Sequence, residues 1–172
     1  MLLPVQAGVP VIGVPESGDS TRSLTPLQPA ERLALEAELG YWLAELAPRV
    51  RWVLPDAIDR AARRSPLLDV HPRELAVQDF LRARLTHIGD PLYGDLRKLN
   101  ALFDTRIALI PVGAVRVPEP AGSDRVHMAV ALIDSFGGNV LWYGVVAGDA
   151  AAPDAAAAAA STAQALARMI MR

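Results

Sequence analysis

The chain carries three histidines, and their spacing is the first test for metal or acid–base chemistry. His71, His87 and His127 lie far apart, and none has another histidine within four residues, as a zinc site on a single element would. His71 has Asp69 and Glu74 nearby, but one neighbourhood of this kind is common in any chain. We therefore predict no metal site and interpret the histidines as surface or capping residues.

A serine in a glycine-bearing turn is the second candidate for chemistry. Gly18-Asp19-Ser20 resembles the nucleophile block of the SGNH hydrolases, and such a serine also needs a general base and an oxyanion hole. That family takes its base from an Asp-x-x-His segment near the C-terminus. The last histidine here is His127, with Asp124 and Arg125 before it, and we interpret this segment as not matching that pattern. The Gly-x-Asn-Asp block is missing too, because Gly138-Asn139 is followed by Val140. We interpret residues 18–20 as a polar turn and keep a hydrolase using Ser20 as an alternative.

Phosphate and nucleic-acid binding find little support in the motifs. Phosphate loops need several glycines between a strand and a helix, and the loop after the first predicted strand holds only Gly18. Binding of single-stranded nucleic acid needs exposed aromatic side chains among basic ones, whereas Tyr93 and Phe103 near Arg97 are better explained by core packing. We expect no cofactor and no nucleic-acid partner. A small-ligand or nucleotide-binding module stays open as a further alternative.

Composition limits the class of protein. The chain has 172 residues, of which 52% are hydrophobic and 21% charged, so it has the length of one domain and is not disordered. Its net charge of -2 sums an acidic start, net -4 over residues 1–48, and a basic middle, net +3 over 49–106. There is no cysteine, which excludes disulfides and thiolate chemistry. No apolar run reaches the ~18 residues of a membrane span.

The first half of the chain predicts strands and helices in alternation. Residues 1–8 are interpreted as a flexible lead-in, and residues 9–14 as a strand because they are apolar and β-branched. Leucines recur on one face from residue 30 to 47, with Pro29 at the first helical position, so this segment is predicted to be an amphipathic helix. Three further elements are predicted: a strand over 50–54, a helix from Asp56 as N-cap to Arg64, and a helix over 73–85.

The second half changes from helical to strand periodicity. Apolar residues spaced by three or four predict a helix over 92–103. Strands are predicted over 107–117, 126–133 and 140–147, with Pro111 and Gly113 indicating a bulge or bend in the first. The alanine-rich segment 153–172 is predicted to be a helix. The order implies an α/β (α+β) fold, in which helices cover a mixed sheet with a C-terminal antiparallel hairpin, as a single compact domain over 9–172.

The hairpin carries the most informative motif. Asp134, Gly138 and Trp142 form the pattern D-x-x-x-G-x-V-x-W, in which glycine permits a positive φ, aspartate bonds turn amides and tryptophan packs on a sheet face. This hairpin resembles that of a group of bacterial envelope α/β domains. The group includes the curli secretion channel lipoprotein, the amino-terminal domain of the Tol-Pal translocation protein and the lipoprotein activators of penicillin-binding proteins. Gly137 stands where these domains commonly carry threonine.

The resemblance implies a function in binding rather than in catalysis. Members of the group assemble, scaffold or activate envelope machinery, so we expect a non-enzymatic domain with a protein partner in the envelope, a second copy of the chain included. The expected location is the periplasm, at the outer membrane if a lipid-anchor cysteine precedes Met1, with the cytoplasm as the alternative. Two candidate contact surfaces are the loop 16–25, with Glu16 and Asp19, and the middle helices, with Arg60, Arg63 and Arg64.

Overall fold

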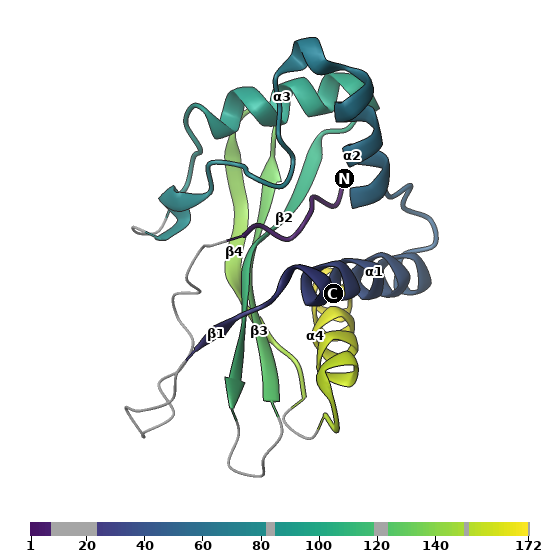
Figure 1. Ribbon diagram of the computed structural model, residues 1–172. Helices are drawn as coiled ribbons and strands as arrows, with labels where there is room; N and C mark the ends of the chain where they lie inside the picture. Colours follow the sequence, from purple (N-terminus) through teal and green to yellow (C-terminus); the bar gives the residue numbers. More distant parts are fainter. Residues whose placement is uncertain (8–23, 82–84, 119–123, 150–151, 172) are drawn as a thin grey trace.

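In the described part of the chain, four strands form one antiparallel sheet in the order β1-β2-β3-β4 (Figure 1). The computed structural model describes residues 1–7, 24–81, 85–118, 124–149 and 152–171. The strands are β1 (Thr25–Pro26), β2 (Ile107–Pro118), β3 (Asp124–Asp134) and β4 (Asn139–Ala147). The predicted α+β class and the C-terminal hairpin are confirmed. Within the described chain, the parallel pairing of the expected mixed sheet is confined to an isolated bridge between Leu2 and Leu109.

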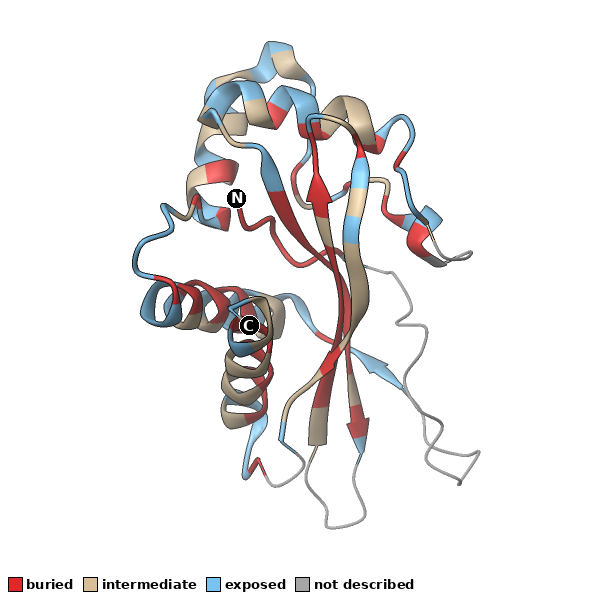
Figure 2. Cartoon of the chain, turned by 180° about the vertical axis from the view of Figure 1, so that it is seen from behind, coloured by how far each residue is buried: buried red, intermediate tan, exposed pale blue. Residues whose placement is uncertain are grey.

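Helices cover both faces of this sheet (Figure 1). Helices α1 (Pro29–Leu46) and α4 (Ala155–Ile170) pack on one face, in a cluster with Met128 and Val130. Helices α2 (Pro55–Arg64) and α3 (Leu92–Phe103) pack on the other face, in a cluster with Ala131 and Ile133. Successive side chains of β3 therefore face opposite clusters. Figure 2 shows the result, with the central strands buried and exposed residues concentrated on the helices.

A bulge in β2 changes which of its residues, even-numbered or odd-numbered, face each cluster. Its register against β3 shifts between Pro111 and Gly113, where the sequence predicts an irregularity. Before the shift the even-numbered residues Ala108 and Ile110 face the α2–α3 cluster, and after it the odd-numbered Val115 does. Because side chains alternate along a strand, one extra residue inverts the parity and keeps each apolar side chain on its proper face.

The N-terminal residues belong to the core, which differs from the expected flexible lead-in over 1–8. The chain runs beside β2, where Leu3 N donates to Leu109 O at 2.9 Å and Gln6 N donates to Pro111 O at 3.0 Å. Leu2 packs into the α1–α4 cluster and Leu3 into the α2–α3 cluster. This segment therefore ties the two layers to the sheet. The strand predicted over 9–14 lies outside the described residues.

Two predicted elements are wrong. Residues 50–54 form no strand, and they pass as irregular chain from α1 to α2, with Val53 O accepting a hydrogen bond from Leu2 N at 2.9 Å. In the described part of the helix predicted over 73–85, residues 73–77 are loop and a short 3-10 turn, η2 (Gln78–Leu81), follows. Asp56 is not the N-cap of α2 either, because the helix begins at Pro55 after Leu54. Val53, Leu75, Val77 and Phe80 of these segments are buried in the core cluster with α2 and α3, without a periodic hydrogen-bond pattern.

Candidate functional site

The hairpin motif has a structural role in the turn between β3 and β4. Asp134 accepts hydrogen bonds from Arg106 Nη2 at 2.6 Å and from Phe136 N at 3.1 Å. The bonded guanidinium of Arg106 lowers the pKa of the Asp134 carboxyl from its ordinary value. Gly138 has a φ of +75°, and Trp142 packs half-buried in the α1–α4 cluster. The three motif residues therefore act as the sequence predicts, by shaping the hairpin.

The hydrolase alternative requires an Asp-x-x-His segment, and β3 contains one near its start. Asp124 and His127 do have this spacing, but residues three apart on a strand point to opposite faces of the sheet. Asp124 forms an ion pair with Arg116 at 3.5 Å, whereas His127 is buried, 6% exposed. The two side chains therefore do not form a catalytic pair. Ser20 lies outside the described residues, as do Glu16 and Asp19 of the expected contact loop.

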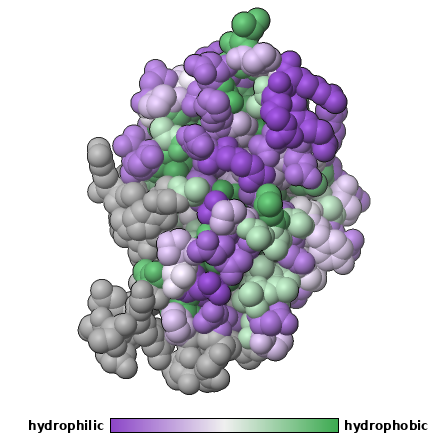
Figure 3. Space-filling model, viewed as in Figure 1, coloured by the Kyte–Doolittle hydropathy of each residue, from purple (hydrophilic) through white to green (hydrophobic). Residues whose placement is uncertain are grey.

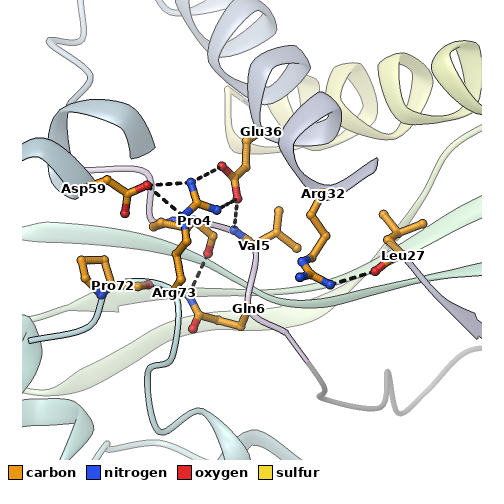
Figure 4. Close-up of polar contacts among 9 residues, drawn as sticks. All are labelled: Pro4, Val5, Gln6, Leu27, Arg32, Glu36, Asp59, Pro72 and Arg73. Atoms are coloured by element: carbon orange, nitrogen blue, oxygen red, sulfur yellow. Dashed lines mark hydrogen bonds and ion pairs between the residues drawn. The ribbon is translucent and has the colours of Figure 1, made fainter. Parts of the chain in front are cut away.

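A buried ionic cluster joins α1, α2 and the N-terminal segment (Figure 4). The guanidinium of Arg73 donates to both carboxylate oxygens of Glu36 at 3.0 Å and, through Nε, to Asp59 at 2.9 Å. Glu36 Oε1 also accepts from Val5 N at 2.9 Å. Bidentate pairing and a backbone donor satisfy a carboxylate whose side chain is only 5% exposed. The cluster therefore fixes α1 and α2 relative to the start of the chain.

A hollow of about 360 Å³ lies beside this cluster, between α2 and the following loop. Its wall carries charges of both signs, including Arg63, His71 and Glu74. Within the described residues, no group of three or more histidine, aspartate or glutamate side chains could hold a metal ion. Arg63, which lines this hollow, also belongs to the exposed surface at the end of α2.

The expected arginines form an exposed basic tip at the end of α2. Arg60, Arg63 and Arg64 are all exposed, and in the described part of the chain none of them forms an ion pair. A short 3-10 turn, η1 (Pro66–Leu68), follows and holds Leu67 fully exposed, at 100%. Figure 3 shows hydrophilic side chains gathered over α2. We call these three arginines and Leu67 the basic tip. Sequence analysis found the arginines but missed the leucine.

The outward side of α1 is apolar, which sequence analysis did not predict. Every exposed residue between positions 30 and 44 is alanine, leucine or tyrosine. The inward side holds Leu35, Leu39 and Leu43, so the helix is apolar on both sides while Glu36 is buried. Figure 3 shows this as a pale green area over α1 and α4. We call the exposed set the apolar face of α1: Ala30, Leu33, Ala34, Ala37, Tyr41 and Ala44.

A hollow of about 300 Å³ extends the apolar face toward the start of α2. Leu33, Tyr41 and Leu54 contribute to its wall and are 51%, 56% and 36% exposed. Gly40 helps to form it, since a Cβ there would come within 3.4 Å of Leu54 Cδ1. Asp56 lines this hollow, and Glu38 and Glu45 lie on α1 outside its lining. None of these three carboxylates forms an ion pair in the described chain.

A second apolar stripe on α1, though not its exposure, could have been found from spacing alone. Leu33, Ala37 and Tyr41 recur every four residues, so they form a second stripe beside the stripe of Leu35, Leu39 and Leu43. Glu38 and Glu45 also lie on this helix, so α1 carries two apolar stripes together with charged residues, whereas a surface helix usually has one apolar stripe. None of the helices described above has the length and apolar character of a membrane-spanning segment.

Comparisons with protein-family models, with curated proteins and with solved structures each give no match to the chain.

Proposed function

We propose that the protein is a non-enzymatic interaction domain of the bacterial cell envelope that acts through protein–protein contacts. The observation that carries this proposal is the apolar face of α1, six exposed positions without a charge on a helix that already buries its other side. Continuous apolar surface on a folded domain marks a binding site, because its exposure to water is unfavourable. A protein partner is the occupant that suits a helix face of this kind.

The apolar face is held rigid before any partner binds. Leu35, Leu39 and Leu43 are fully buried beneath it, and Glu36 is held by Arg73 and Val5. A surface whose backbone and anchors are already ordered loses less conformational entropy on binding. This preorganisation supports a docking role for α1.

The envelope location is supported by the resemblance of the hairpin to those of envelope α/β domains. Fractionation of cells that produce the full-length protein from its own gene, with its native start, tests this part. We expect the protein in the periplasmic or outer-membrane fraction. Recovery in the cytoplasm alone would contradict the envelope location and leave the contact surface to be tested separately.

Site-specific photo-crosslinking in the producing cell tests the contact surface. We expect a photoreactive phenylalanine at Tyr41, which is 56% exposed, to give a covalent protein adduct on irradiation. The matched control is the same residue at Ala101, an exposed alanine of α3 away from the apolar face. Adduct formation at position 41 and not at 101 supports the proposal. Equal yields at both positions, or none at 41, would contradict it.

A further inference from the structure

We infer that the partner of the apolar face is a second copy of this chain, which docks its basic tip there. This inference rests on the proposed function and names the occupant of that surface. Each copy carries both halves of the contact: an apolar face with a hollow beside acidic residues, and an exposed leucine among arginines. Complementarity of shape, of apolar character and of charge supports the pairing.

The apolar halves fit each other. Leu67 is 100% exposed in the middle of a short 3-10 turn, where no described residue of its own fold covers it. The hollow beside α1 measures about 300 Å³ and is lined by the apolar side chains of Leu33, Tyr41 and Leu54, with the carboxylates Glu36 and Asp56 also in its wall. A protruding aliphatic side chain that enters an apolar hollow is the usual form of an anchor at a protein interface.

The charges are complementary as well. Glu38, Glu45 and Asp56 lie around the apolar face, and the tip carries three arginines, all without ion pairs in the described chain. Docking of the tip brings opposite charges together around an apolar centre. The other symmetric arrangement, α1 against α1, would bring Glu38 and Glu45 of both copies together, and like charges at an interface are unfavourable.

The two halves lie at opposite ends of α2. The hollow includes Pro55 and Asp56 at the start of the helix, and the tip follows its last turn at Arg63 and Arg64. A helix of 10 residues spans about 15 Å, so the tip does not reach the hollow of its own chain. Figure 3 shows hydrophilic side chains over α2 and a pale green area over α1 and α4 on the same face of the molecule. A two-fold axis between two copies therefore allows each tip to meet the other copy's hollow.

Sedimentation velocity of the full chain over a concentration series, from about 10 μM to about 1 mM, tests the inference. We expect a concentration-dependent dimer that weakens as salt rises, because exposed ion pairs are screened. Leu67→Ser removes the anchor and Ala37→Glu places a charge in the apolar face. Each is expected to raise the dissociation constant at least about tenfold. The exposed positions provide matched controls, Leu141→Ser and Ala101→Glu, which should leave it unchanged.

Mixing the two variants gives the decisive result. Leu67→Ser keeps an intact apolar face and Ala37→Glu keeps an intact tip, so a mixture restores one contact and should contain more dimer than either variant alone. A monomer at every concentration, or a dimer unaffected by both substitutions, would overturn the inference. If the photo-crosslink at position 41 then joins only other proteins, self-docking is excluded while the proposed contact function stands. If position 41 gives no adduct with any protein, both the self-docking inference and the proposed contact function are contradicted.

Discussion

At the scale of single residues, the ionic cluster around Arg73 shows how buried charge is compensated. Glu36 is more deeply buried than its partner, with side-chain exposures of 5% for Glu36 and 38% for Arg73. Loss of the arginine therefore leaves a carboxylate away from water with only Val5 N as a donor. Loss of the carboxylate leaves Arg73 with Asp59 and with access to solvent. Removal of Arg73 is therefore expected to lower the stability of the fold more than removal of Glu36.

We expect Arg73→Met to lower the free energy of unfolding by about 3 kcal/mol, since an uncompensated buried charge is costly. Glu36→Gln keeps an acceptor for Val5 N and should cost less, about 2 kcal/mol. Urea denaturation of both variants measures the difference. Arg49→Met, at an exposed position, is the control and should change stability by less than about 0.5 kcal/mol. A larger loss for Glu36→Gln than for Arg73→Met would contradict this account.

At the scale of elements, the β3–β4 hairpin depends on one glycine. Gly138 has a positive φ, and a Cβ there would lie 2.8 Å from His87 Cε1. The segment around His87 closes on the turn, with Ile88 N donating to Gly138 O at 2.8 Å and Val140 N donating to Thr86 O at 3.0 Å. The turn is therefore constrained both by its own backbone conformation and by a neighbouring segment.

Gly138→Ala should destabilise the fold by at least about 1–2 kcal/mol, because the left-handed conformation alone costs that much for a residue with a Cβ. The clash with His87 adds to this cost. Gly89→Ala is the matched control, since a Cβ there meets no atom within 4 Å. Thermal unfolding should show a clearly lower midpoint for Gly138→Ala than for Gly89→Ala. Equal midpoints would show that the turn tolerates a side chain.

At the scale of the whole molecule, the N-terminal segment connects the two helical layers through the sheet. Leu2 and Leu3 are both fully buried, and they point into different clusters. Gln6 adds polar ties, with its side chain donating to Pro72 O at 3.0 Å and accepting from Leu75 N at 2.9 Å. A loose lead-in would make none of these contacts.

Leu3→Ala should therefore cost about 3 kcal/mol of stability, the usual range for a leucine deleted from a packed core. Leu141→Ala, at a position 53% exposed, should cost less than about 0.5 kcal/mol. Urea denaturation of the two variants measures the difference in their free energies of unfolding. We expect both free energies to fall with the same slope as the urea concentration rises. A neutral effect of Leu3→Ala would contradict the placement of this segment in the core.

The sequence by itself determined the elements whose periodicity is local. Apolar residues three or four apart in α1 and α3, strict alternation in β3, and the turn chemistry of Asp134 and Gly138 all act between neighbours along the chain. Pro111 and Gly113 indicated the bulge for the same reason. Arg60, Arg63 and Arg64 were found as a surface because arginine is seldom buried.

Only the tertiary structure decided which apolar residues face water. The burial of Leu3 and the irregular path of residues 50–54 depend on contacts with β2 and with the N-terminal segment, which are distant in sequence. The exposure of Leu33, Tyr41 and Leu67 depends on which neighbours are present, and hydropathy is the same for a leucine inside or outside. The exposure of the outer stripe of α1 therefore became visible only when the inner stripe had been assigned to the core and the described residues were seen to leave the outer stripe uncovered.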